Sequence, residues 1–363
     1  MLTLWLRKHL QQRKPADLMI THKNKIACAG AAAMVVAFVL VTASSCSRAK
    51  EWQTDEGAVW HTTYRIVYYG AESLSDSIVE VLNEVEQSLS PFKEGSLISR
   101  INRNETDSTD ALIAEAFGIA QRINRASAGR FDPTVAPLVD LWGFGTDSLS
   151  RRRIESGDYS LPQEAIDSAL SLVGIGECRI LVDGKMVKKH AGTTFNFSSI
   201  TKGMGCDKVG EMLQRNGVED YMVEIGGEIA ARGKNMRGQP WQIQVDRPEE
   251  TDGLPTHHGM GIIALQDCGV ATSGNYRNFH DTRKYGRVGH TIDPVSGYPI
   301  KGEVLSATVI APTCGEADGW ATACMATGDV AAALAMIESA EGVEAMIISA
   351  EGDSLVTRTT DRW

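Results

Sequence analysis

The stretch from Ser306 to Thr322 constrains the fold most, because a run of small and β-branched residues typical of a strand passes directly into a helical pattern. Thr313 is a suitable N-cap for that helix, and Glu316 three residues later completes a capping box. Asp318 and Thr322 are four residues apart, so they share one face near the helix start. Their carboxylate and hydroxyl are hard oxygen donors of the kind that Mg²⁺ prefers. The free N–H groups of the helix start would also favour a phosphate.

A second candidate feature lies just before this segment, in a turn. His290 and Asp293 stand close to Pro294 and Gly297, so a titratable imidazole is predicted on a loop. A base, a metal site and a helix start together indicate phosphoryl-group chemistry. Each part also has a purely structural interpretation, because capping boxes are common and His290 alone fits an ordinary hydrogen-bonded loop residue. Spacing alone leaves both interpretations open.

The predicted secondary structure is mixed, and strands and helices do not alternate as βαβ units. Apolar residues recur at helical spacing in three segments, which are 74–89, 110–126 and 202–214. Strand patterns occupy the segments 51–69, 221–232, 241–245, 261–265 and 343–349. A hairpin is expected at 179–187, with Asp183 and Gly184 as its turn. This order predicts an α+β fold with largely antiparallel sheet and packed helices.

Missing motifs and the charge balance exclude several classes of site. The sequence has no Gly-x-Gly-x-x-Gly, P-loop, His-Glu-x-x-His or Gly-x-Ser-x-Gly motif, so a dinucleotide would bind without a Rossmann fingerprint. A net charge of −10 disfavours nucleic acid as a partner, since its binding needs a basic footprint. The seven cysteines are scattered and form no Cys-x-x-Cys pair, which indicates neither a zinc ribbon nor a disulfide framework; most are expected to be buried.

The N-terminal region is typical of an export signal. Lys23 and Lys25 precede an apolar run at 26–41, and small residues then lead to Cys46. A Cys directly after Ala-Ser-Ser resembles a bacterial lipobox, in which that residue is lipidated and becomes the mature N-terminus. The alternative is a transmembrane anchor, which needs about 20 predominantly apolar residues. The run is shorter and rich in alanine, so a cleaved lipoprotein signal is favoured.

Two parts of the chain are therefore expected. Residues 1–45 form an N-terminal extension and lipoprotein signal peptide, with Met19 as an alternative start. Residues 46–363 form one domain, in which the polar, arginine-containing segment 147–163 is a surface insertion. The lipid on Cys46 would anchor this domain in the bacterial cell envelope, facing the periplasm. Ser47 follows the lipidated position, and this does not decide between the inner and the outer membrane.

Six ordered blocks of the chain resemble the ApbE family of FAD:protein FMN transferases. The last is the tandem of His-x-x-Asp-Pro-x-x-Gly from His290 and Ala-Pro-Thr-Cys-x-Glu-Ala-Asp-x-x-Ala-Thr from Ala311. The others, in family order, are 90–102, 131–145, 196–203, 224–229 and 271–276. The resemblance runs from about Val59 to the end of the chain, and the ordered series is far more specific than any one block.

The resemblance implies a role for each matching residue. Mg²⁺ would be held by Asp318, by Thr322 and by the main-chain carbonyl of Ser199. His290 would be the general base, and Asp293 would either orient it or serve as a turn residue. The residues implied to bind the cofactor, by lining its pockets or contacting it, are Trp60, Phe92, Leu141, Trp142, Gly143, Asn196, Lys202 and Thr291. The aromatic members also fit simple core packing.

The activity implied by the resemblance is Mg²⁺-dependent transfer of the FMN moiety of FAD to a Thr or Ser hydroxyl of an acceptor protein, with release of AMP. The acceptor would be an exported or membrane redox protein. Two alternatives remain, which are an FAD pyrophosphatase that gives FMN and AMP, and a flavin-binding lipoprotein without catalysis. Several residues depart from the family pattern: Asn196 replaces a usual Asp, Trp60 a common Met and Phe92 a common Tyr. Ser198 and Ser199 also replace a pair of small residues, and Thr201 replaces an Ala.

Overall fold

A computed structural model describes residues 49–145, 161–248, 259–274, 279–282, 284–352 and 354–363, and the part from Lys50 to Trp363 is one compact unit. The expected signal peptide, Cys46, most of the segment 147–163 and residues 249–258 lie outside these residues.

The described residues form the following helices and strands. The helices are α3 (Ser75–Leu89), α4 (Leu97–Asn102), α5 (Ala111–Ala126), α6 (Ala136–Leu141), α8 (Gln163–Ser171), the 3-10 helix η1 (Ile175–Glu177), α9 (Ser198–Arg215), α10 (Cys314–Thr327) and α11 (Val330–Glu338). The strands are β1 (Glu51–Val59), β2 (Thr62–Gly70), β3 (Arg179–Ile180), β4 (Met186–Val187), β5 (Tyr221–Ile225), β6 (Glu228–Arg232), β7 (Trp241–Asp246), β8 (Gly259–Leu265), β9 (Cys268–Gly274), β10 (Phe279–Thr282), β11 (Gly286–Gly289), β12 (Val304–Ala311), β13 (Glu344–Glu351) and β14 (Ser354–Thr359).

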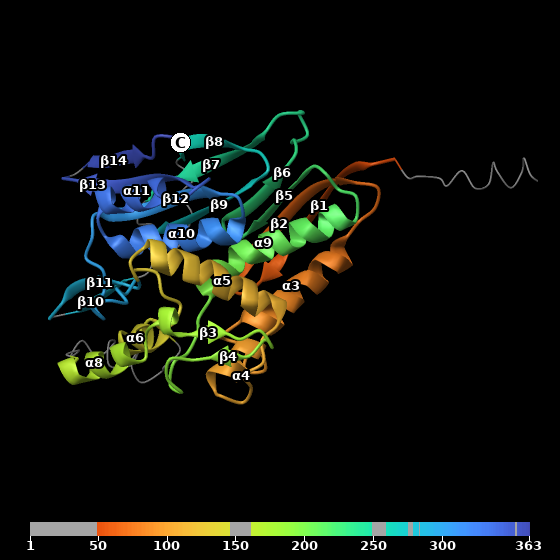
Figure 1. Cartoon of the computed structure of the whole chain (residues 1–363). Helices are drawn as coiled ribbons and strands as arrows, with labels where there is room; N and C mark the ends of the chain where they lie inside the picture. Colours follow the sequence, from red (N-terminus) through yellow and green to blue (C-terminus); the bar gives the residue numbers. More distant parts are fainter. Residues whose placement is uncertain (1–48, 146–160, 249–258, 275–278, 283, 353) are drawn as a thin grey trace, which may run out of the picture. The chain divides into compact units, whose positions relative to one another are not determined.

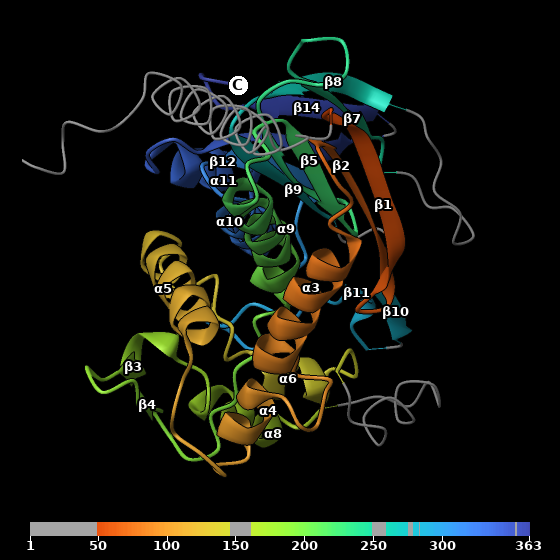
Figure 2. The same ribbon diagram turned by 90° about the vertical axis from the view of Figure 1, so that its right-hand side faces the viewer.

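An eight-stranded sheet forms the frame of the molecule, in the order β1-β2-β5-β6-β9-β12-β13-β14. Every neighbouring pair in it is antiparallel, which confirms the expected α+β class with antiparallel sheet. Helices α3, α9, α10 and α11 cover one face, and the β7–β8 hairpin lies on the other (Figures 1 and 2). Consecutive residues of β2 show why, because Ile66 packs in the cluster under α3 and α9 whereas Val67 packs in the cluster with Trp241 of β7.

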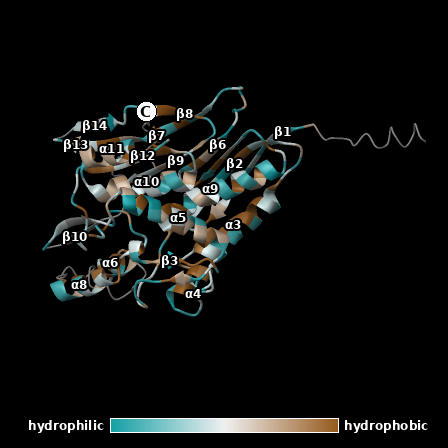
Figure 3. Ribbon diagram, viewed as in Figure 1, coloured by the Kyte–Doolittle hydropathy of each residue, from teal (hydrophilic) through white to brown (hydrophobic). Residues whose placement is uncertain are grey.

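The expected helices at 74–89 and 110–126 are confirmed as α3 and α5. Helix α3 buries one stripe (Ile78, Val81, Leu82, Val85, Leu89), and its other face carries acidic residues. Asp110 caps α5 by accepting a hydrogen bond from the main-chain nitrogen of Ile113 at 2.8 Å. In Figure 3, hydrophilic and hydrophobic residues both occur along α3, as an amphipathic helix requires. Helix α10 differs, because nearly all of its residues are buried between the sheet and the neighbouring helices.

The segment 51–69, expected as a strand region, is a hairpin of β1 and β2. Its two turn residues are Trp60 and His61, with φ of 48° and 63°. A tight two-residue hairpin turn of this kind needs positive φ at both positions, and Asn-Gly or Asp-Gly usually supplies it. Because neither turn residue is Gly, Asn or Asp, the sequence carries no local signal for the reversal.

Smaller expectations had mixed outcomes. The hairpin at 179–187 is confirmed, with Gly184 in the left-handed region at φ 78°. Helix α9 begins at Ser198, one turn before the expected start at 202. The end of the presumed surface insertion is partly buried, because Leu161 is only 6% exposed and α8 begins at Gln163. The five described cysteines form no disulfide, and four are buried. No helix within the described ranges combines the length and apolar character that crossing a bilayer requires.

Candidate active site

The site is built on the contact between α9 and α10. Gly203 makes this contact possible, because a β-carbon there would overlap the main-chain carbonyl of Cys314. The close approach lets the main-chain nitrogen of Gly203 donate a hydrogen bond of 3.2 Å to Asp318 Oδ2. The two helices therefore hold Asp318 at a fixed place, buried to 2% exposure.

At the start of α10, the described residues show one of the two hydrogen bonds of the expected capping box, and main-chain nitrogens there are already bonded to a carboxylate. Thr313 Oγ1 accepts from the nitrogen of Glu316 at 3.3 Å, as expected. The nitrogens of Cys314 and Gly315 donate to the carboxylate of Asp207, at 2.9 and 2.8 Å. The expectation of free N–H groups for a phosphate at this helix start is therefore wrong, because a carboxylate of α9 already occupies them.

A cluster of three charged side chains forms the floor of the site. Lys202 Nζ lies 3.0 Å from Glu228 Oε1 and 3.6 Å from Asp318 Oδ2. Burial raises the pKa of Glu228 to about 8, with the neighbouring Asp318 adding to the shift, and burial also raises the pKa of Asp318. Burial opposes the charge on Lys202, but the carboxylates of Asp318 and Glu228 outweigh it and raise the pKa of the ammonium. The buried Oε2 of Glu228 has no hydrogen-bond partner among the residues that the structure describes.

This cluster opens into a cavity of about 340 Å³ that collects most of the predicted site residues. Its walls come from α6, α9, β6, β9, α10 and the loops that carry Arg130, Asn196 and His290. The predicted residues that line it are Asn196, Ser199, Lys202, His290, Thr291, Asp318 and Thr322. The implied metal ligands and the implied base thus share one cavity. Thr322 Oγ1 lies 3.4 Å from the hydroxyl of Ser273, which also lines the wall.

Three further residues of this cavity carry ionisable side chains and had no assigned role, which are Arg130, Asp132 and Glu228. The carboxylate of Asp132 accepts hydrogen bonds from the main-chain nitrogens of Thr134 and Ile175. Glu228 belongs to a block quoted for the family resemblance, and its position directly after Gly226 and Gly227 gave no signal of a buried carboxyl group. Arg130 directly precedes the block 131–145. Only the packing of β6 against α9 and of the loop after α5 against residues 290–300 brings them to the site.

The loop that carries His290 is held by its own turn. Asp293 is buried, and its carboxylate accepts hydrogen bonds from the nitrogen of Val295 at 3.0 Å and the hydroxyl of Ser296 at 2.8 Å. Its carbonyl accepts from the nitrogen of Gly297 at 2.8 Å. Arg130 Nη1 lies 3.3 Å from Asp293 Oδ2. These contacts favour the turn role for Asp293 over the orientation of His290.

A neighbouring cavity of about 670 Å³ is lined by two of the three aromatic residues that were predicted to bind the cofactor. Trp60 and Phe92 line it, together with Ser198 and Lys202, which also line the smaller cavity. Phe92 is 63% exposed at its rim. Trp60 packs against α9 at Gly205, where a β-carbon would lie 2.6 Å from the indole ring. The two cavities meet at Lys202, so a ligand with two ends could occupy both.

Leu141, Trp142 and Gly143 are not among the described residues that line either cavity. Trp142 is fully buried and packs edge-on against Tyr285, with ring centroids 5.1 Å apart. Its indole nitrogen donates to the carbonyl oxygen of Gly297 at 2.8 Å. Trp142 therefore supports the loop that carries His290, and direct cofactor contact by this segment stays a prediction.

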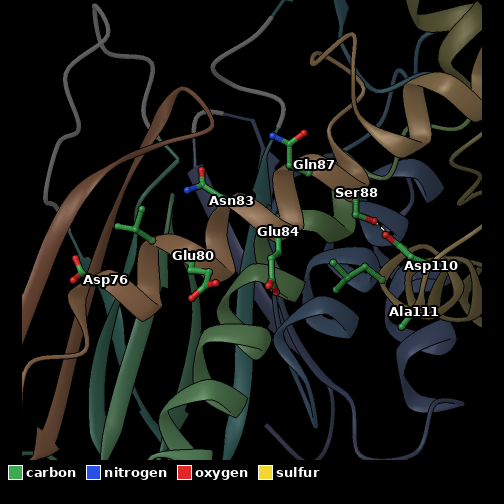
Figure 4. A pocket seen from close by; sticks show the side chains of 10 residues that line it. Asp76, Glu80, Asn83, Glu84, Gln87, Ser88, Asp110 and Ala111 are labelled. Carbon is green, nitrogen blue, oxygen red and sulfur yellow. Dashed lines mark hydrogen bonds between the residues drawn. The ribbon is translucent and has the colours of Figure 1, made fainter.

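A groove of about 740 Å³ between α3 and α5 has a different character (Figure 4). Acidic side chains line it, including Asp76, Glu80 and Glu84 of α3. None of the predicted site residues borders it. Its carboxylates would repel a phosphate, so the groove is not a candidate for phosphoryl chemistry.

Comparisons with known proteins identify one family. A sequence model of the ApbE family matches residues 60–347. The chain is 33% identical over 300 residues to the FAD:protein FMN transferase of Vibrio cholerae, covering 80% of this chain and 86% of that protein. It is 30% identical over 346 residues to the FAD:protein FMN transferase of Salmonella typhimurium, covering 90% and 94%.

Solved structures give the same result at the level of fold. The structure of the flavin transferase ApbE from Vibrio cholerae superposes with a TM-score of 0.73 at 32% identity, covering 86% of this chain and 98% of that chain. The apo form of the Pseudomonas stutzeri flavinyl transferase ApbE superposes with a TM-score of 0.72 at 29% identity, covering 86% and 95%. Fold and site together define an enzyme of the transferase class. The chain belongs to the ApbE family.

Proposed function

We propose that this protein transfers the FMN moiety of FAD to a Thr or Ser hydroxyl of an acceptor protein, with release of AMP. The observation that supports this most is the placement of His290, Lys202 and Asp318 around one cavity that adjoins a second one. FAD has two ring systems joined by a pyrophosphate, which matches two cavities that meet at a cation. The names of the related transferases support the same substrate.

The residues present suit Mg²⁺. Asp318 and Thr322 supply a carboxylate and a hydroxyl, Ser199 supplies a main-chain carbonyl, and Mg²⁺ binds through one or two carboxylates together with substrate phosphates. The floor of the site carries two carboxyl groups against the single ammonium of Lys202, so a further cation is favoured there. When bound, Mg²⁺ would neutralise the pyrophosphate and polarise its bridge.

His290 is the candidate base for the transfer. A neutral imidazole accepts the proton of the acceptor hydroxyl as its oxygen attacks the phosphorus on the FMN side. The bond from that phosphorus to the bridging oxygen breaks, AMP leaves, and the acceptor carries FMN as a phosphoester. Lys202 lies where the two cavities meet, so its ammonium can stay close to the pyrophosphate during the reaction.

We further propose that the protein works in the bacterial cell envelope, anchored through a lipid on Cys46 and facing the periplasm. The basic residues, the short apolar run and the small residues before Cys46 support this placement. The acceptor is then an exported or membrane redox protein. Strand β1 begins five residues after Cys46, so such a tether would keep the start of β1 within about 20 Å of the lipid.

The test is incubation of the purified protein with FAD and Mg²⁺, with and without a flavin-accepting domain. Fluorescent acceptor in a denaturing gel, lost on adding EDTA, is the expected result. Free FMN and AMP with no labelled acceptor would instead identify an FAD pyrophosphatase. Intact FAD in both reactions would leave a flavin-binding protein without catalysis.

A further inference from the structure

Arg130 is the second cation of the smaller cavity, and the proposed reaction does not use it. It follows α5 and lines the cavity together with Lys202 and His290. Its side chain is 40% exposed. Within the described part of the chain its only hydrogen-bond or ion-pair partner is Asp293, at 3.3 Å from Nη1 to Oδ2.

The contact with Asp293 leaves most of this guanidinium available. A charge-assisted N–H···O bond is typically about 2.7–2.9 Å long, so 3.3 Å is a loose contact. Asp293 already accepts hydrogen bonds from Val295 and Ser296, and does not depend on Arg130 to satisfy its carboxylate. A guanidinium has five N–H donors in a planar fork, and only one is used here.

Lys202 is in the opposite situation. Its ammonium lies within 3.6 Å of both Glu228 and Asp318, which hold it on the floor of the cavity. Of Lys202 and Arg130, Arg130 is therefore the side chain whose N–H donors are available to a ligand. It also borders the loop of His290, where the attacked phosphorus must lie if His290 is the base.

We propose that Arg130 is a specificity-determining residue that binds the phosphate of the flavin half of the substrate. Its guanidinium donates two hydrogen bonds to non-bridging oxygens of that phosphate, because the planar fork matches phosphate geometry. The loose contact with Asp293 keeps the fork beside His290 before the substrate arrives. This assignment rests on the proposed function, in which FMN and FAD are ligands of this cavity.

Ligands that differ only in phosphate separate this role from others. Riboflavin, FMN and FAD are titrated with Mg²⁺ into the full-length protein in mild detergent, followed by flavin fluorescence. Hydrogen bonds to charged groups predict that Arg130→Gln weakens binding of FMN and FAD by about tenfold to a hundredfold, and leaves riboflavin binding nearly unchanged. Arg130→Lys should recover only part of the loss, since it restores the charge without the fork.

Two controls keep the result specific. Arg125→Gln removes the same charge from an exposed position outside both cavities, and should bind all three ligands like the parent. Asp293→Asn loosens the turn and weakens the contact with Arg130 but keeps the guanidinium, and should reproduce only a small part of the selective loss for FMN. Thermal melting of each variant confirms that it is folded.

The outcomes distinguish the two proposals. Unchanged FMN binding by Arg130→Gln would overturn the role of Arg130, and so would an equal loss for riboflavin, which would place Arg130 on the ring instead. If Asp293→Asn weakens FMN binding as much as Arg130→Gln does, Arg130 acts by supporting the turn and does not bind the phosphate. Failure of the parent protein to bind any flavin would instead refute the proposed function itself.

Discussion

The indole nitrogen of Trp142 donates a 2.8 Å hydrogen bond to the main-chain oxygen of Gly297, 155 residues further along the chain. Gly297 closes the turn that Asp293 begins, and His290 stands just before that turn. A residue that sequence resemblance assigned to a cofactor pocket therefore acts on the site through a buried hydrogen bond. His290, the proposed base, therefore stands on a loop that is held in place from outside the cavity.

Replacing Trp142 by Phe should remove the hydrogen bond that supports the loop of His290. The change leaves the buried carbonyl of Gly297 without its donor, which costs about 1–3 kcal/mol of stability. Trp241→Phe is the matched control, because that indole donates to the carbonyl of Arg232 at 3.0 Å on the far face of the sheet. We expect both variants to lose stability in urea and only Trp142→Phe to slow FMN transfer. Equal transfer rates would show that the loop keeps its position without Trp142.

His290→Ala should abolish transfer and keep FAD bound. General-base catalysis contributes about 10²–10⁴-fold, so the single-turnover rate should fall by that factor. Flavin fluorescence measures binding, and covalent labelling of the acceptor measures the rate. His190→Ala removes an exposed imidazole outside both cavities and should leave both readouts as they were. A transfer rate close to that of the parent would exclude His290 as the base.

Asp318→Asn should remove the dependence on Mg²⁺. The amide keeps the shape of the side chain but not the charge that the implied metal needs. Transfer measured across a Mg²⁺ titration should stay near background, and EDTA should have no further effect. Thr322→Val, which removes a neutral ligand, should give a smaller loss. Normal Mg²⁺-dependent transfer by Asp318→Asn would place the metal elsewhere.

Gly203→Ala should disturb the site through the backbone. The added methyl meets the carbonyl of Cys314, and overpacking of this kind costs about 1–3 kcal/mol. Gly118→Ala on α5 is the control, because the nearest atom that its β-carbon would meet, Nη1 of Arg122 on the same helix, lies at 3.8 Å, and helix propensity favours Ala by about 1 kcal/mol. Urea unfolding should therefore move in opposite directions for the two variants. If Gly203→Ala is as stable as the parent, the two helices can separate without cost.

Glu228 should make stability depend on pH in a metal-free buffer. Its folded pKa of about 8 exceeds its ordinary value of 4.5, so the native state retains a proton that the unfolded state releases between these values. Stability contributed by this group is complete below pH 4.5 and falls as pH rises towards 8. Glu228→Gln lacks this titration, so its stability relative to the parent should increase between about pH 5 and pH 8. Urea denaturation with EDTA at both values measures the difference, and a constant difference would contradict the shift.

Parts of this molecule could be predicted because their signals are local. Helices α3 and α5 follow from apolar spacing, and the start of α10 follows from Thr313 and Glu316. The grouping of His290 with Asp318 was first suggested by their closeness in the sequence, 28 residues apart, and the family resemblance then strengthened it. In the structure both residues line one cavity, and their roles stay predictions.

Other parts could not be predicted, because their causes lie far away in the chain. Asp207 occupies the start of α10 from a different helix, so the apparent anion site was lost. Glu228 becomes a buried member of the site only when β6 packs on α9. Arg130 reaches the cavity through the packing of two loops. These contacts depend on tertiary structure, and no single segment of sequence contains them.

The turn at Trp60 and His61 bears on how this enzyme could be engineered. Two side chains with β-carbons are held in the left-handed region, at about 1–2 kcal/mol each, where an Asn-Gly pair would form the same reversal at little cost. A search for heat-resistant variants would choose these positions first. Trp60 lines the larger cavity, so replacing it to gain stability would also remove an aromatic contact for a bound substrate. This hairpin is thus a place where durability and activity are expected to conflict.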